Sequence, residues 1–594
     1  MKFVLMFQND TAAFFPELFL AITILIVLLH GSFLGVIAAS LYSYLTPSMV
    51  RLTSVILFLS LLLVINNPIS PQTLWNALFI TDCIGVWAKS VVFIGLLFCV
   101  SVSESYMFFS RFRAYEFFVF ILGIGLSLCL LISSYDLLSV YLSMEFLSLI
   151  FYVLASWKKN SYFSAEAGLK YFILGSVASV FFLFGSSLIY FALGTTNLAS
   201  LSILTENLIT FSPFILFGLV CIVSALLFKL GAAPYHMWIA DVYEGAPTIV
   251  SLIFAVVPKI AFFVVVLRLS FISFWSLFPV FWEDFFCICG LLSVFIGCVC
   301  GLGEIKIKRL LAFSSVGHVG FLCLGLSNGS VEGVQAVLFY LILYILTASF
   351  LWIYVLYLDL TSDSSLLTFA DAIGLMRSNS FLGFGVVLMI FSLAGIPPFG
   401  GFFAKLNIFI SLINSSFYIV AVFVVFTSVI SAFYYIRLIK KKYFERNKFG
   451  PFLRLELKGV CGRSHSRSGC TLCVLDQLLR APATPLQQQV EAGQPTYVAV
   501  LKKGGCIGNR LVWKPPRFQK NQCRRRLKTS TNSVPDKTGD DVLDLTPGKY
   551  CCLCHVQALM GCCSLDFTSA ESNLAVARCG VFCKLRLSGV QHPR

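Results

Sequence analysis

The sequence predicts an all-α protein that crosses a membrane many times. Of its 594 residues, 58% are hydrophobic and only 12% are charged, whereas in soluble domains about half are apolar and about a quarter charged. Many apolar stretches of about 18 or more residues follow one another, and each is long enough to span a bilayer as a helix. The first, from about residue 14 to 36, is itself long enough to span, so no separate removable signal peptide is expected.

We predict about thirteen spans from the apolar stretches. They lie near residues 14–38, 51–66, 84–104, 115–133, 137–156, 168–193, 212–236, 246–268, 284–303, 309–327, 333–358, 380–414 and 416–438. The twelfth is too long for one straight helix and is interrupted by "AGIPPFGG".

The loops between these spans differ in charge, which predicts the orientation of the chain. Loops after odd-numbered spans hold most basic residues: Arg51, Arg111, Arg113, Lys158, Lys159, Lys306, Lys308, Arg309, Arg377, Arg437 and Lys440 to Lys442. Loops after even-numbered spans hold Asp136, Glu206 and Glu332, with Arg268 as the main exception. Because basic loops stay inside, the odd-numbered loops are expected to face the cytoplasm or mitochondrial matrix, and the N-terminus the other side.

Glycine and proline interrupt two of the spans. The breaks are "KLGAAPYHMW" around Pro234, in the seventh span, and "AGIPPFGGFFAK" around Pro397 and Pro398, in the twelfth. Each is the fourth helix of a five-helix unit, formed by spans 4–8 and 9–13. A matched pair of broken helices indicates an inverted repeat with functional sites near the middle of the membrane. The alternative is that membrane helices simply tolerate proline.

Four ionisable side chains stand out well inside predicted spans: Glu145, Lys229, Lys259 and Lys405. Such groups are expensive in a membrane and are functional candidates by default. We expect Lys229 to pair with Glu145, to be hydrated through the broken helix, and to gain or lose a proton when its neighbour's charge changes. The alternative is a static ion pair between Glu and Lys that only orients helices.

Other polar residues are weaker candidates. His236 and His318 are residues that can relay protons near neutral pH, although His236 is close to a span end. Glu166 and Lys170 are spaced i, i+4, which favours an ion pair at a helix entrance. Asp241 and Glu244, in "DVYEGAPT", are expected to be loop or cap residues.

At these residues the chain resembles a known family. The matching segments are "SSYDLLSVYLSMEFLSLIFYVLAS", "SAEAGLKYFILG", "FKLGAAPYHMWIADVYEGAPT", "VPKIAFF", "KIKRLLAFSSVGHVGF", "AGIPPFGGFFAKL" and "FYYIRLIKKKYF". They resemble mitochondrial NADH–ubiquinone oxidoreductase chain 2, an antiporter-like membrane subunit of respiratory complex I, in its plant-type versions. The resemblance covers residues 14–446.

The resemblance implies a function and a place in the cell. It implies a core subunit of the mitochondrial inner membrane that couples electron transfer from NADH to ubiquinone, in other subunits, to proton translocation. Glu145 would be a modulating carboxylate, Lys229 the central proton site, Lys259 a relay, and Lys405 an exit or hand-over site. The chain itself would bind no cofactor or metal, while NADH, FMN, iron–sulfur clusters and ubiquinone belong to the whole complex. Its partners would be other membrane-arm subunits and the lipid bilayer.

The composition changes sharply after the last predicted span, which divides the chain into a membrane domain, 1–446, and a basic tail, 447–594. Residues 451–594 hold 21 Lys+Arg, 9 Asp+Glu and 12 of the 21 Cys. The family continues instead into a fourteenth helix. "CTLC" and "CCLCH" suggest zinc, but no second pair lies at the spacing of a zinc finger. No nucleic-acid-binding module surrounds the basic residues. We expect a disordered tail, and its abrupt onset favours read-through of unspliced or misannotated sequence.

Three other functions remain open from the sequence alone. A stand-alone cation/proton antiporter has the same architecture, and a structural spacer that has lost pumping would also keep the fold. A nucleic-acid binder acting through the tail would require retention of RNA or DNA at physiological salt.

Overall fold

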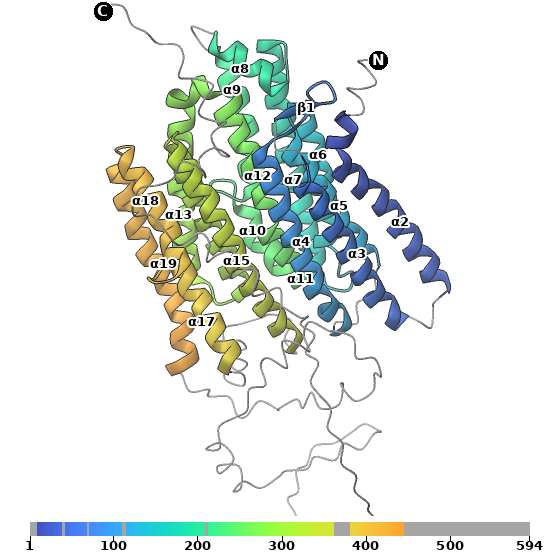
Figure 1. The fold of residues 1–594 in the computed structure, drawn as a ribbon. Helices are drawn as coiled ribbons and strands as arrows, with labels where there is room; N and C mark the ends of the chain where they lie inside the picture. The colour runs from blue at the N-terminus through green and yellow to red at the C-terminus, as the bar shows by residue number, and fades with distance from the viewer. Residues whose placement is uncertain are drawn as a thin grey trace, which may run out of the picture. The chain divides into compact units, whose positions relative to one another are not determined.

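The computed structural model describes residues 9–37, 42–67, 71–109, 115–207, 212–361 and 380–444. Within them, twelve helices are long and apolar enough to cross a membrane, and two shorter apolar helices follow one another where the twelfth span was predicted. Every one of the thirteen predicted spans therefore coincides with a helix or a pair of helices (Figure 1). The predicted tail, 447–594, lies outside the described residues, as do Arg111, Arg113 and Arg377.

The described helices divide into three groups along the chain. The first group is α2 (Phe15–Ile37), α3 (Tyr42–Ile65) and α4 (Cys83–Phe109). The second is α5 (Glu116–Ser133), α6 (Leu137–Ala155), α7 (Tyr162–Leu193), the short α8 (Leu198–Glu206), α9 (Pro213–Leu230), α10 (Met237–Gly245), α11 (Thr248–Val256) and α12 (Pro258–Leu267). The third is α13 (Glu283–Gly303), α14 (Ile307–Ser327), α15 (Val331–Thr361), α17 (Ser380–Ala394), α18 (Gly400–Asn414) and α19 (Tyr418–Phe444).

The second and third groups are the two predicted five-helix units. In each unit the fourth crossing is split, into α9 and α10 in one and into α17 and α18 in the other. Because each unit contains five crossings, an odd number, the second unit begins on the opposite side from the first. That is the topology of an inverted repeat.

The first break is closed by a glycine. Gly231 follows α9 with a φ of 77°, a left-handed conformation that glycine adopts without steric cost. The Gly231 N–H donates to the carbonyl of Phe228 at 3.1 Å, and the Ala232 N–H donates to that of Leu227 at 2.9 Å. This pair of bonds is a Schellman motif, which satisfies carbonyls at the end of a helix.

The second break repeats the same backbone pattern. Gly395 follows α17 with a φ of 80°. Its N–H donates to the carbonyl of Ser392 at 3.0 Å, and the Ile396 N–H donates to that of Phe391 at 3.1 Å. The segments after both glycines also contain a cis X–Pro bond, Ala233–Pro234 in one and Pro397–Pro398 in the other. The two predicted breaks are thus confirmed, and they are built alike.

The eighth crossing is interrupted at Pro258, which has no N–H, but its backbone stays helical there, since the Val257 N–H donates to the carbonyl of Ile253 at 3.2 Å. α11 ends at Val256 and α12 begins at Pro258. We did not predict this interruption, because proline is tolerated at the first position of a helix and only one isolated proline marks the site. The interruption places Lys259 in the first turn of α12, although the whole crossing runs from Thr248 to Ser273.

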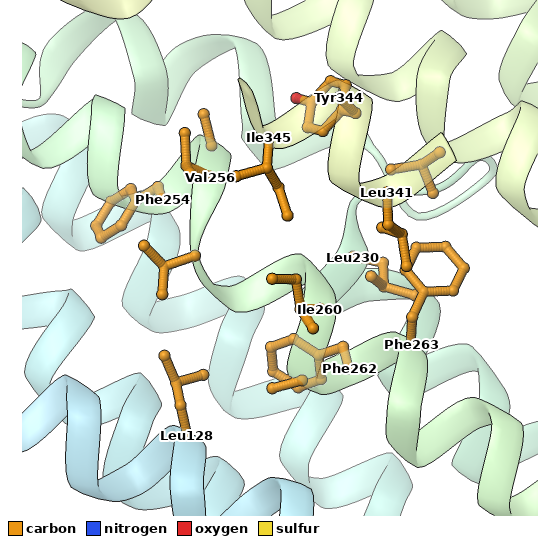
Figure 2. Packing of buried hydrophobic residues seen from close by; sticks show 14 of the residues in the cluster. Leu128, Leu230, Phe254, Val256, Ile260, Phe262, Phe263, Leu341, Tyr344 and Ile345 are labelled. Carbon is orange, nitrogen blue, oxygen red and sulfur yellow. The ribbon is translucent and has the colours of Figure 1, made fainter. Parts of the chain in front are cut away.

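Among the candidate membrane spans of the described residues, the crossing that contains this interruption is the most completely buried. The whole window from Thr248 to Ser273 is rich in side chains with almost no exposed surface. Phe254 and Val256 precede the interruption and Ile260, Phe262 and Phe263 follow it, with Leu341, Tyr344 and Ile345 of α15 opposite (Figure 2). Burying apolar side chains on every face is typical of a central membrane helix.

A short β-hairpin joins α3 to α4, a departure from the all-α expectation. β1 (Gln72–Leu74) pairs antiparallel with β2 (Phe79–Thr81). The loop between α5 and α6 is bonded to it, because the Tyr135 N–H donates to the Leu78 carbonyl at 2.9 Å. The hairpin therefore ties together loops on the even-numbered side of the membrane domain.

Arg268, the exception to the charge pattern of the loops, is compensated in the structure. It lies at the end of the eighth crossing, and its Nη2 is 2.8 Å from Oδ1 of Asp82. Its Nη1 also donates to the carbonyl of Ser134 at 3.2 Å. The guanidinium is therefore part of a neutral, largely buried pair.

Candidate functional site

Lys229 lies in the last turn of α9, immediately before the first break. Its side chain is 8% exposed, and its Nζ is a buried atom without a hydrogen-bond partner. The Nζ lies over the ring of Tyr152, whose centroid is 5.7 Å away. An ammonium in this setting has little stabilisation beyond a weak cation–π interaction.

Glu145, on α6, is close to this region but does not touch Lys229. Its Oε2 accepts a bond from Ser148 at 3.3 Å, and its Oε1 is buried without a partner. Among the described residues, the carboxylate takes part in no ion pair within 4.0 Å. The predicted Glu145–Lys229 pair is therefore absent as a direct contact, which also argues against a static bridge.

A small cavity connects Lys229 to Lys259. Its volume is about 10 Å³, and its lining includes both lysines together with Ser148, Tyr171 and Tyr243. About 10–15 Å³ is the least volume that holds one water molecule. The cavity therefore lies at the lower limit for a single water between the two lysines.

Lys259 lines this first cavity and contacts α15. Its side chain is 4% exposed, and its Nζ donates a hydrogen bond to Oη of Tyr344 at 2.8 Å. The same Nζ is 4.3 Å from the centroid of the Tyr344 ring. One tyrosine thus supplies both a hydrogen-bond acceptor and an aromatic surface to the buried lysine.

Lys405 lies after the second break, on α18, and is held by the end of α17. Its side chain is 5% exposed. Its Nζ donates to the carbonyls of Leu393 at 3.2 Å and Ala394 at 3.0 Å. These carbonyls belong to the last turn of α17, where the helix dipole favours a positive charge.

A second cavity joins Tyr344 to Lys405. It has a volume of about 20 Å³, and its lining includes His318, Tyr340, Tyr344, Ser392 and Lys405. That volume holds one water molecule. Lys229, Lys259 and Lys405 are therefore connected through two cavities and the Tyr344 hydroxyl.

His318, a weaker candidate from the sequence, lies within this line. Its Nδ1 is 2.7 Å from Oη of Tyr340, and its Nε2 is 3.4 Å from Oη of Tyr435. The other candidate, His236, is only half-buried at the start of α10. The sequence analysis missed the tyrosines, although Tyr340 and Tyr344 stand one helical turn apart in the apolar segment "LFYLILYIL".

A set of charged residues surrounds α10 on the basic-loop side. Lys170 pairs with Glu166 at 2.9 Å, as predicted, and also with Asp241 at 2.8 Å. Glu244 pairs with Lys306 and, at 3.6 Å, with Arg309. Asp241 and Glu244 lie inside α10, so the prediction that they are loop or cap residues is wrong. The short helix continues because its buried face packs on α7 and α14.

A buried ion pair among the first helices also escaped the sequence analysis. Lys89 of α4 lies 2.5 Å from Glu17 of α2, and their side chains are 4% and 1% exposed. Because both groups lie near predicted span ends, they were not distinguished from loop charges. This pair lies outside both cavities.

No metal centre is formed by the part of the chain that the structure describes. Within these residues, no group of three or more His, Cys, Asp or Glu side chains is placed to hold a metal ion. The cysteine motifs "CTLC" and "CCLCH" lie outside the described residues.

The fold and the buried lysines define a polytopic membrane protein of the antiporter-like class, with two inverted five-helix units. Residues 134–431 match the family described as NADH:quinone oxidoreductase/Mrp antiporter, transmembrane. The chain belongs to this family.

Individual relatives show which members of this family the chain is similar to. The chain is 37% identical to NADH-ubiquinone oxidoreductase chain 2 of Marchantia polymorpha over 454 residues, 75% of this chain and 91% of the relative. It is 35% identical to NADH-quinone oxidoreductase subunit N of Pelagibacter ubique over 435 residues, 73% of this chain and 89% of the relative. The resemblance to chain 2 of plant mitochondria is thereby confirmed.

Solved structures show the same architecture. A chain of respiratory complex I from Thermus thermophilus matches with a TM-score of 0.61 at 28% identity, covering 73% of this chain and 91% of that chain. A chain of the Mrp complex from Dietzia sp. matches with a TM-score of 0.62, covering 74% of this chain and 81% of that chain. At 20% identity, the second match shows the fold alone.

Proposed function

We propose that this chain is a core membrane-arm subunit of NADH:ubiquinone oxidoreductase and that it translocates protons. The named relatives and the match to respiratory complex I support membership of that complex. The observation that carries proton translocation is the line from Lys229 through Lys259 and Tyr344 to Lys405.

In this proposal each of the four ionisable residues has a distinct role. Lys229 is the central proton site, because its unpartnered ammonium is readily influenced by a change in nearby charge. Glu145 modulates it across the gap between them, without a bond. Lys259 relays the proton towards α15, and Lys405 is the exit or hand-over site, where the α17 carbonyls stabilise its charged form.

The electron-transfer chemistry lies elsewhere in the complex. NADH, FMN, iron–sulfur clusters and ubiquinone belong to other subunits in this proposal, and the partners of this chain are other membrane-arm subunits and lipid. The plant relatives support a place in the mitochondrial inner membrane. The proton-translocating domain comprises residues 1–446, while residues 447–594 are read-through sequence, which sequencing of the mature transcript tests.

The decisive experiment is Lys229→Ala in the assembled complex. We expect NADH oxidation to continue under uncoupled conditions while protons pumped per NADH decrease, because the central proton site is gone. Lys159→Ala is the control, since Lys159 is an exposed lysine in the loop after α6. Unchanged pumping in Lys229→Ala would instead support a structural spacer.

Because the matching family also includes the Mrp antiporter, a stand-alone cation/proton antiporter is the second candidate function. Purification separates the two. Co-migration with a large NADH-oxidising assembly supports the complex I subunit, whereas a free monomer or small complex supports the antiporter.

A further inference from the structure

Tyr344 links the two cavities through one hydrogen bond. It lines the second cavity, and its hydroxyl accepts a hydrogen bond from Lys259, which lines the first. Its ring centroid is also 5.3 Å from that of His318. Tyr344 is not among the four candidate residues chosen from the sequence.

The direction of the hydrogen bond leaves the tyrosine proton available. The Lys259 ammonium can only donate, so Oη of Tyr344 is the acceptor at 2.8 Å. A phenol hydroxyl has one proton of its own to donate while it accepts. Tyr344 can therefore take a proton from Lys259 and give its own to an acceptor in the second cavity.

We propose that Tyr344 is a hydroxyl relay that carries protons from Lys259 to the cavity of Lys405. One Nζ–H bond of the Lys259 ammonium breaks as a new Oη–H bond forms. The original Oη–H bond breaks, and its proton passes to the neutral amine of Lys405, directly or through one water molecule. Lys259 ends neutral, Tyr344 is unchanged, and Lys405 becomes an ammonium. This inference rests on the proposed function.

The surroundings favour a relay over a charged intermediate. Tyr344 is 5% exposed and lies in the buried packing around α11 and α12 (Figure 2). An isolated phenolate there would be costly, whereas an exchange of protons leaves the hydroxyl neutral at both ends. The new ammonium at Lys405 meets two carbonyls already aimed at its Nζ.

A structural role for Tyr344 predicts a different result. The ring alone could support Lys259 through the cation–π interaction at 4.3 Å. Tyr344→Phe separates the two roles, because it removes the hydroxyl and keeps the ring. Tyr354→Phe is the matched control, since Tyr354 is a buried tyrosine on the same helix, α15, outside both cavities.

The test measures protons pumped per NADH in membrane vesicles containing the assembled complex, together with NADH oxidation in the presence of an uncoupler. We expect Tyr344→Phe to lower coupled proton transport about tenfold or more, because a positioned proton-transfer group typically contributes about 10²–10⁴-fold in rate. Uncoupled NADH oxidation should be preserved. Adding Lys405→Ala should cause no further loss, because both changes interrupt one route.

Two results would overturn the relay. Pumping in Tyr344→Phe equal to that in Tyr354→Phe would show that the hydroxyl is dispensable. Additive losses from Tyr344→Phe and Lys405→Ala would place the two residues on separate routes. If Lys229→Ala also pumped normally, the proposed function itself would fail, which is a separate outcome.

A second pair of variants decides the question if Tyr344→Phe does not assemble. Tyr344→His keeps an aromatic group that accepts and donates protons, whereas Tyr344→Met fills similar space with neither capacity. The relay predicts pumping in Tyr344→His and its loss in Tyr344→Met. Equal pumping in both variants would contradict it.

Discussion

The two broken helices have the same backbone conformation at the break, but the surroundings of their lysines are opposite. Both breaks begin with a left-handed glycine, Gly231 or Gly395, and close the preceding helix with the same two hydrogen bonds. Lys229 precedes its break and has no hydrogen-bond partner. Lys405 follows its break and binds two carbonyls from the helix before it. An inverted repeat can thus supply one lysine that is sensitive to distant charge and one whose charged form is stabilised by backbone carbonyls.

The strongest test of this comparison replaces each lysine with leucine. We expect both Lys229→Leu and Lys405→Leu to lower coupled pumping about tenfold or more, because positioned proton-transfer groups typically contribute about 10²–10⁴-fold in rate. Only Lys405→Leu should also destabilise the subunit, by about 1–3 kcal/mol, because it orphans buried carbonyls. Thermal unfolding of the purified complex measures the difference. Equal losses of stability would show that Lys229 has an unseen partner.

Glu145→Gln probes the sensitivity of the first lysine to charge. The change removes a negative charge near Lys229 without removing a bond between them, so we expect reduced pumping and a shifted pH profile of pumping. Lys405 lies in another cavity and should be unaffected. Combining Glu145→Gln with Lys229→Ala should therefore add nothing, while full activity of Glu145→Gln alone would remove its modulating role.

The glycines test the backbone that the breaks share. Alanine at either glycine is strained by a positive φ, which costs about 1–2 kcal/mol. A Cβ at Gly231 would lie 1.8 Å from Cδ1 of Ile239, whereas a Cβ at Gly395 would lie 2.9 Å from Cδ of Lys405. We expect Gly231→Ala to lower mainly the stability and Gly395→Ala to lower pumping through displacement of Lys405. The reverse pattern, measured by unfolding and vesicle assays, would contradict this.

Two serines that bind backbone near the breaks are expected to affect stability alone. Oγ of Ser293 accepts the Ala233 N–H at 2.9 Å, and Oγ of Ser392 accepts the Gly401 N–H at 3.2 Å. Ser293→Ala should cost about 1–3 kcal/mol, because the N–H is buried in unwound chain. Ser392→Ala should cost less, because its bond is longer and only partly buried. Unfolding midpoints that rank the other way would reverse this part of the comparison.

The sequence predicted the crossings and the two principal breaks because both depend on local signals. Apolar length reports a membrane helix, and Gly with Pro reports an interruption. The lysines could also be predicted, because they are charges among apolar residues. The interruption at Val257 could not be predicted, since Pro258 also suits the start of an ordinary helix.

Pairing between distant residues could not be predicted. Lys89 and Glu17 are 72 residues apart, and Arg268 and Asp82 are 186 apart. The expected Glu145–Lys229 pair failed for the same reason, because a sequence shows that two charges are buried but not how their helices are rotated. Tyr344 was overlooked because tyrosine is common in membrane proteins and its hydroxyl gains meaning only from the position of Lys259.

The Asp82–Arg268 pair also bears on how the chain is made. During synthesis Asp82 emerges long before Arg268, so the third crossing is available when the eighth arrives. A lone arginine on the even-numbered side would pull the eighth crossing towards the wrong orientation. Once the eighth crossing has inserted, the carboxylate neutralises the guanidinium, so an early helix anchors a much later one in its inserted position.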